Sequence, residues 1–164
     1  MDSAAGSMKS GRKNTLYQAV MPLRGKVLNV IEKSEEQMMS NKELFTIFKA
    51  IGLGTDTYNI SSDAKSTEEK YEILKKHARY GKIIICTDAD PDGASIAASI
   101  LVALSRFSKY LIEFGFVYVA EAPLYEQNGK FYFTSDQDST GKIPGFDQSK
   151  PYQRFKGLNT SPLT

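Results

Sequence analysis

Three aspartates lie at alternate positions within one short segment of the sequence: Asp88, Asp90 and Asp92. Carboxylates this close repel one another unless a cation lies among them. Hard, negatively charged oxygen ligands select Mg²⁺ or Ca²⁺ over softer metals. The spacing lets Asp88 and Asp90 face a common point, while Asp92 lies nearby or caps the helix that follows. The segment therefore predicts a site for a divalent cation.

The sequence on either side of the three aspartates predicts a strand and a helix. Residues 82–87 form a nearly continuous apolar run, which is typical of a parallel strand buried on both faces. Residues 94–113 repeat apolar side chains at helical spacing, and Gly115 ends the helix. Ligands of α/β sheets bind at the carboxyl ends of the strands, so the acidic segment lies where a site is expected.

The remaining elements predict an α/β fold with a mostly parallel sheet flanked by helices. In chain order, the other predicted elements are a helix over 2–11, a strand over 16–23, helices over 40–51 and 67–79, and a strand over 116–121. Asn128-Gly129 predicts a hairpin turn between strands over 124–127 and 130–134. Residues 135–151 are rich in loop-forming residues and predict a linker.

The composition, with 41% hydrophobic and 24% charged residues, is that of an ordinary globular protein and excludes a disordered chain. The single cysteine, Cys86, cannot form an internal disulfide and indicates a reducing, cytoplasmic setting. The sequence has no run of 18 apolar residues, and residues 1–6 lack the order of a signal peptide. We therefore expect no membrane association.

Charge is distributed unevenly along the chain, although the formal net charge is only +2. Residues 1–33 carry six Lys or Arg and two acids, whereas residues 81–134 carry four basic and six acidic residues. Such a pattern suits a surface that binds a polyanion and also holds a cation. An ordinary solvated surface fits the charge pattern equally well.

Three other interpretations of the acidic segment remain open at this point. An EF-hand loop begins with the same spacing, but it needs a Glu at its twelfth position, where this chain has Ser99. A phosphatase-type site would use Asp88 as nucleophile and Asp90 as acid and base. The segment could also be a solvated turn in which Asp92 caps the following helix.

Residues 83–93 (IIICTDADPDG) resemble the metal-binding motif of Toprim domains. Five further segments resemble, in the same order, motifs of type IIA topoisomerase B-type subunits: 2–6 (DSAAG), 23–30 (LRGKVLNV), 51–54 (IGLG), 117–125 (VYVAEAPLY) and 153–158 (QRFKGL). The chain is thereby identified as a member of the family that contains the B-type subunits of DNA gyrase and topoisomerase IV, and the resemblance implies the Rossmann-like Toprim fold.

The resemblance also implies roles for individual residues. Asp88 and Asp90 would be the principal Mg²⁺ ligands, with Asp92 as an auxiliary acid. Asp88 would act in catalysis, and Lys156 would lie near the same catalytic face. The Mg²⁺ ion would stabilise the charge that develops on the phosphate during cleavage.

The resemblance further implies contacts with double-stranded DNA. Arg24 and Lys26 would contact the DNA backbone near the scissile phosphate. Asp2 and Ser3 would lie beside the cleavage site. The alternative is a module that binds DNA or the A-type subunit through Arg24, Lys26 and Lys9 without taking part in catalysis.

Several parts of the implied reaction lie elsewhere. The family comprises ATP-dependent type IIA topoisomerases, in which the tyrosine that attacks DNA belongs to the partner A-type subunit and ATP binds in a separate N-terminal domain. The motif normally begins with a Glu two residues before the position of Asp2, and Met1 stands where the family has Gly. We therefore expect the chain to be inactive alone.

The resemblance also divides the chain into two regions. Residues 1–134 would form the Toprim domain, and residues 135–164 a linker and a C-terminal tail that carries the RFKGL segment. Within that tail, Asn159 and Thr160 replace the usual Gly-Glu of the family.

Overall fold

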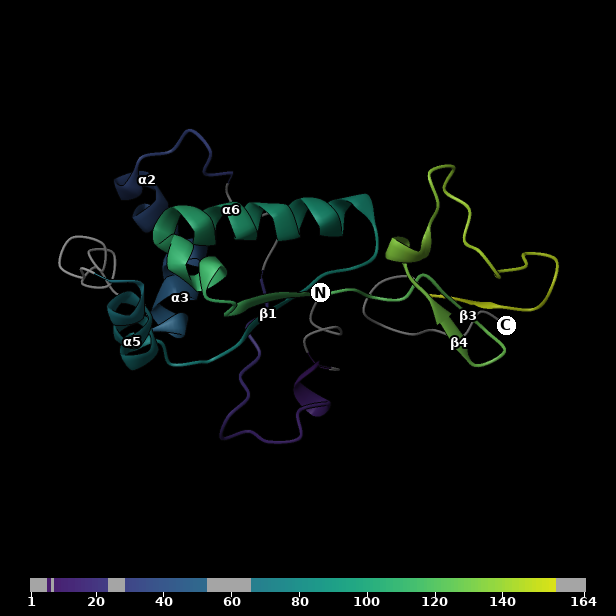
Figure 1. Ribbon diagram of the computed structural model, residues 1–164, viewed down its shortest axis with the longest axis horizontal. Coiled ribbons are helices and arrows are strands. Elements are labelled where there is room, and N and C mark those ends of the chain that lie inside the picture. Colours follow the sequence, from purple (N-terminus) through teal and green to yellow (C-terminus); the bar gives the residue numbers. More distant parts are fainter. Residues whose placement is uncertain (1–5, 7, 24–28, 53–65, 156–164) are drawn as a thin grey trace.

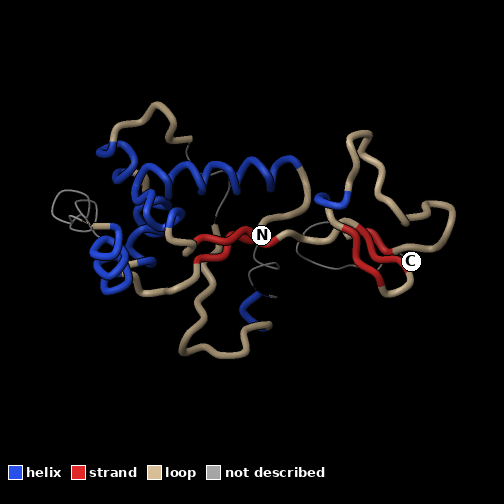
Figure 2. Tube along the Cα trace, in the orientation of Figure 1, coloured by secondary structure: helices blue, strands red, loops and turns tan. Residues whose placement is uncertain are grey.

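The computed structural model describes residues 6, 8–23, 29–52 and 66–155 of the 164-residue chain. Two parts follow one another along the long axis of the molecule (Figure 1). The first holds the helices and a two-stranded parallel sheet, and the second holds a three-stranded antiparallel sheet (Figure 2). The predicted α/β class is confirmed, with a parallel sheet that is small in the described part of the chain.

The parallel sheet is a strand–helix–strand unit. Strand β1 (Ile83–Cys86) pairs in parallel with β2 (Val117–Ala120), and helix α6 (Pro91–Glu113) forms the crossover between them. Parallel neighbours need such a long connection, because a short turn can only reverse the chain. The strand and helix predicted on either side of the aspartates are therefore confirmed, with the helix beginning three residues earlier than expected.

Helices α2 (Glu35–Ser40), α3 (Lys42–Ile51) and α5 (Thr67–His77) begin at side-chain caps. Asn41 accepts a hydrogen bond from the amide of Leu44 at the start of α3. Ser66 forms a capping box at the start of α5. Helix α2 has no counterpart among the predicted elements, although its own capping box, Ser34 with Gln37, is visible in the sequence.

The hydrophobic core lies between α3, α5, α6 and strand β1. The rings of Phe48 and Phe107 stack at a centroid distance of 3.7 Å and join α3 to α6. Leu104 of α6 is fully buried. The other buried members of this core are Val30, Met38, Leu44, Ile47, Ile51, Leu74, Ile85, Ala97, Ile100, Ala103, Leu111 and Phe116.

Helix α6 is long and apolar enough, with a mean hydropathy of 1.4 over its most apolar window, to match a membrane span by length and composition. Its buried positions, such as Ile100 and Leu111, instead pack into the protein core. The helix is interrupted at Ser108, where φ is −155° and ψ is 91°. We therefore regard α6 as the central core helix of the fold.

The second part is built on a β-hairpin. Strands β3 (Tyr125–Gln127) and β4 (Lys130–Tyr132) pair antiparallel, and β5 (Gln153–Arg154) pairs with the other edge of β3. Asn128 and Gly129 both have positive φ, 54° and 78°, as the predicted hairpin turn requires. A short 3-10 helix, η2 (Thr134–Asp136), follows the hairpin.

Two predictions made from the first 90 residues are wrong. Residues 16–23 form no strand. Asn14 accepts a hydrogen bond from the amide of Leu16, which turns the chain. Pro22 has no amide proton with which to hydrogen-bond a neighbouring strand. Strand β1 is not buried on both faces, because the Ile84 side chain on its outer face is 58% exposed. In the predicted helix over 2–11, the described residues 6 and 8–10 are helical.

Replacement of Leu104 by Ala is expected to lower the free energy of unfolding by about 2–5 kcal/mol, since the side chain is fully buried and the change leaves a cavity. Leu16→Ala is the matched control: Leu16 is 85% exposed, so its loss should cost within about 0.5 kcal/mol of zero. Denaturant unfolding measures both values. Equal effects of the two substitutions would contradict the core assignment.

Candidate metal site and nucleic-acid interface

The three aspartates lie in and just after the turn that joins the carboxyl end of β1 to the amino end of α6. Asp88 is half-buried, whereas Asp90 and Asp92 are exposed. Asp90 is the N-cap of α6, and its Oδ1 accepts a hydrogen bond of 2.7 Å from the amide of Gly93. The prediction that Asp92 caps the helix is therefore wrong, because Asp92 lies within the first helical turn.

Gly93 allows the turn to be this tight. A Cβ added at this position would lie 2.2 Å from the carbonyl oxygen of Asp88 and 3.0 Å from its carbonyl carbon. Both contacts are with backbone, which has less freedom to move than the end of a side chain. The backbone of Asp88 is thus packed directly on the first turn of α6, and only glycine fits there without a shift of the turn.

The amino end of α6 stabilises negative charge on the turn. The free amides at the start of a helix carry the positive end of its dipole, which stabilises nearby carboxylates. Pro91 supplies the first helical residue, where a missing amide proton costs nothing. The turn therefore places two acids at the end of a strand and a third on a helix end that favours negative charge.

The donor set fits Mg²⁺ in its chemistry, because carboxylate oxygens are the ligands that this ion takes from proteins. One oxygen of Asp90 is used by the cap hydrogen bond to Gly93. Across residues 6, 8–23, 29–52 and 66–155, no group of three or more His, Cys, Asp or Glu side chains is arranged to hold a metal ion. Asp88 and Asp90 remain the predicted pair of ligands.

Five of the predicted site residues lie outside the described residues. They are Asp2, Ser3, Arg24, Lys26 and Lys156. Their predicted roles beside the cleavage site, on the DNA backbone and at the catalytic face therefore remain predictions.

Cys86 lies two residues before Asp88 in strand β1. Burial raises the pKa of its thiol, so the side chain is uncharged at neutral pH. Its Sγ lies 4.0 Å from the carbonyl oxygen of Ile84, which is a weak contact. We therefore interpret Cys86 as a small hydrophobic residue of the strand.

Arg106 is a residue that sequence reasoning missed. From α6 its Nη1 donates hydrogen bonds to the backbone carbonyls of Val30 and Ile31, which lie about 75 residues earlier in the chain. These bonds join the helix after the acidic turn to residues that follow Arg24 and Lys26 in sequence. No sequence signal marks this contact, because an arginine in an apolar helix is equally compatible with an exposed face.

The sequence matches known proteins over nearly its whole length. The Toprim domain family matches residues 1–122. The DNA gyrase B subunit of Halalkalibacterium halodurans is 43% identical over 164 residues, covering 96% of this chain and 23% of that protein. The chloroplastic/mitochondrial DNA gyrase B subunit of Nicotiana benthamiana is 40% identical over 163 residues, covering 96% of this chain and 20% of that protein.

The DNA gyrase B subunit of Streptococcus pneumoniae is also 40% identical, over 168 residues, covering 96% of this chain and 24% of that protein. The chain thus spans about a quarter of the length of the curated relatives that it matches. The strand, acidic turn and helix described above all lie within the matched Toprim region. On these grounds the chain belongs to the Toprim domain family and is a homologue of the Toprim region of the DNA gyrase B subunit.

Proposed function

We propose that this chain supplies the Mg²⁺-binding acids of a type IIA DNA topoisomerase, for cleavage and religation of both DNA strands. The observation that carries the proposal is the acidic turn itself. It presents Asp88 and Asp90 at the carboxyl end of a parallel strand, in a chain about 40% identical to gyrase B subunits. A phosphatase-like hydrolase receives no support from these relatives.

The chain's own residues would bind and orient the ion. Asp88 and Asp90 would hold Mg²⁺, which, when bound, neutralises charge developing on the reacting phosphate. Gly93 and the cap hydrogen bond fix the backbone from which both acids project. Asp92 adds negative charge beside the pair and so raises the local concentration of cations.

DNA binding would come from basic residues elsewhere in the chain. We assign Arg24 and Lys26 to the DNA backbone, Asp2 and Ser3 to the neighbourhood of the cleavage site, and Lys156 to the catalytic face. The attacking tyrosine would come from an A-type partner subunit, and ATP would act through a separate domain. We place this activity in the cytoplasm, although the Nicotiana relative is a chloroplastic/mitochondrial protein.

A binding module without catalysis is the second candidate. One observation favours it: residues 1–33 carry six Lys or Arg against two acids, and Lys9 among them is exposed. Such a module would bind DNA through Arg24, Lys26 and Lys9. Its affinity for DNA would depend neither on Mg²⁺ nor on the presence of Asp88. Electrostatic contacts of this kind weaken steeply as salt is added.

Mg²⁺ is expected to raise the midpoint of thermal unfolding, and the double variant Asp88→Asn with Asp90→Asn is expected to lose this response. A ligand at one hundred times its Kd stabilises the folded state by about 2.7 kcal/mol. Asn is chosen because it caps a helix as well as Asp does, so the change removes charge but preserves the start of α6. Thermal unfolding with and without Mg²⁺ measures the effect.

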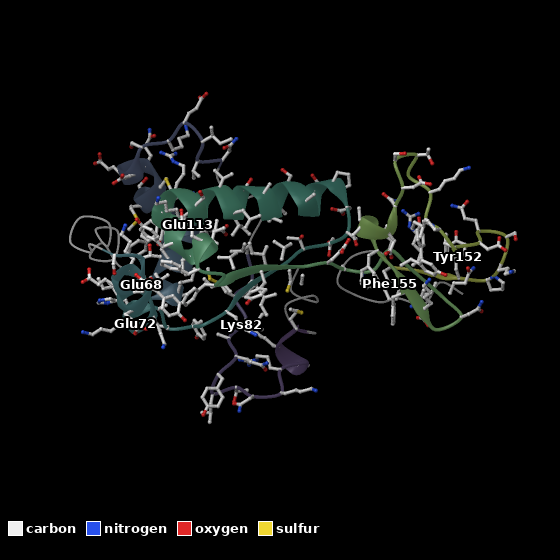
Figure 3. All side chains as sticks on the ribbon, in the orientation of Figure 1. Glu68, Glu72, Lys82, Glu113, Tyr152 and Phe155 are labelled. Atoms are coloured by element: carbon white, nitrogen blue, oxygen red, sulfur yellow. The ribbon has the colours of Figure 1, made fainter. Side chains whose placement is uncertain are left out.

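The matched control is Glu68→Gln with Glu72→Gln, which removes the same number of charges from exposed positions on α5 (Figure 3). This control should respond to Mg²⁺ as the unaltered chain does. A full response in the Asp88 and Asp90 variant would refute the metal site. DNA binding that ignored Mg²⁺ and Asp88 but fell with Arg24→Ala would establish the binding module instead.

Gly93→Ala is expected to destabilise the chain by about 1–3 kcal/mol, as overpacking does, and to weaken the response to Mg²⁺. The sign of the change in the free energy of unfolding is informative. When nothing blocks its Cβ, Ala stabilises a helix relative to Gly by up to about 1 kcal/mol. The matched control is Gly81→Ala, since no atom lies within 4 Å of a Cβ at that position. If Gly93→Ala stabilised the chain, the close contact with Asp88 would be wrong.

A further inference from the structure

Gln127, the last residue of β3, is a buried polar residue whose side chain is hydrogen-bonded to a distant loop. The residue is only 5% exposed. Nε2 donates to the carbonyl of Asp147 at 2.8 Å and, at 3.4 Å each, to those of Lys150 and Pro151. Oε1 accepts from the amide of Asp147 at 3.0 Å. Both ends of the amide are therefore used to hold one segment, residues 147–151.

A second hydrogen bond and an aromatic cluster hold the same loop against the hairpin. The hydroxyl of Tyr132, in β4, donates to the carbonyl of Gly145 at 2.8 Å. The ring of Phe146 stacks on Tyr125 at a centroid distance of 4.5 Å and meets the edge of Tyr152 at 5.1 Å. The segment predicted to be a linker is thus packed on the hairpin, at least from residue 145 onward.

The loop held by Gln127 leads directly into β5. Arg154 pairs with Tyr125, and the amide of Phe155 donates to the carbonyl of Leu124 at 3.0 Å. Tyr152 and Phe155, on either side of β5, both belong to this second part of the molecule (Figure 3). Strand β5 has only two residues, so its register depends on the loop before it.

We propose that Gln127 is a positioning residue: it fixes the register of β5 and thereby the place from which the chain continues into Lys156. This inference rests on the proposed function, in which Lys156 serves the catalytic face. Gln127 itself would touch neither DNA nor metal. Its effect would pass through the backbone of residues 147–155, which is hydrogen-bonded to the hairpin at both ends.

The test replaces Gln127 by Leu, which has a similar size but neither donor nor acceptor. Hydrogen exchange on the full chain should show the amides of Asp147 and Phe155 exchanging about tenfold faster or more, because buried partners are left unsatisfied. Amides of β1 and α6 should keep their rates. Gln148→Leu is the matched control, since Gln148 is an exposed residue of the same loop.

The functional readout is Mg²⁺-dependent DNA cleavage by the assembled complex of this chain with the A-type subunit. Gln127→Leu should lower the cleavage rate at saturating DNA about tenfold and leave the Kd for DNA unchanged. A purely structural weakening would lower the amount of folded complex but not the rate per bound complex. Tyr132→Phe, which loses only the bond to Gly145, should change both readouts in the same direction by less.

Each outcome supports or overturns the proposal. Unchanged exchange at Phe155 overturns it, as does faster exchange with an unchanged cleavage rate. If Gln127→Leu fails to fold, Tyr132→Phe provides the test. The proposal then requires that the exchange rate of the Phe155 amide rises and the rate of DNA cleavage falls in the same variant. If the Asp88 and Asp90 variant cleaved DNA normally, the proposed function would fail, while the exchange result would still decide whether Gln127 holds β5.

Discussion

The contact between the backbone of Asp88 and the first turn of α6 is the constraint on which the candidate site depends. Residues 87–90 join the end of β1 to the start of α6, a connection of ordinary length for a strand followed by a helix. Here Gly93 lets the Asp88 carbonyl lie against the helix, and Asp90 caps that helix from within the turn. As a result, the two acids project from backbone that is fixed on one side by a sheet and on the other by the longest helix of the described chain.

The same constraint explains how adjacent acids are tolerated in a folded protein. The positive end of the α6 dipole and the cap hydrogen bond each stabilise negative charge on the turn. These effects offset part of the repulsion between Asp88 and Asp90. Under the proposed function, a bound cation would offset the remaining repulsion and add to the stability of the turn.

Sequence patterns predict the elements whose local signals agree with the global fold, and they fail where a tertiary contact decides. The apolar run before the aspartates and the Asn128-Gly129 turn each predict an element that the structure contains. The loop after the hairpin is predicted as a linker, because composition records its turn residues but not the aromatic rings that pack it on the hairpin. The hydrogen bonds of Arg106 and Gln127 join residues far apart in the chain. Neither an arginine nor a glutamine in the sequence predicts which distant backbone group its side chain will contact. The strand and helix on either side of the aspartates are therefore predictable from sequence, whereas the long-range hydrogen bonds of Arg106 and Gln127 are not.

The most direct measurement is anomalous diffraction from crystals of the chain, in complex with DNA and the A-type subunit, containing Mn²⁺ as a stand-in for Mg²⁺. We expect an anomalous peak at about 2 Å from carboxylate oxygens of both Asp88 and Asp90. A well-ordered complex with no peak at this turn, or with Mn²⁺ bound only elsewhere, would contradict the assignment of the two aspartates as metal ligands.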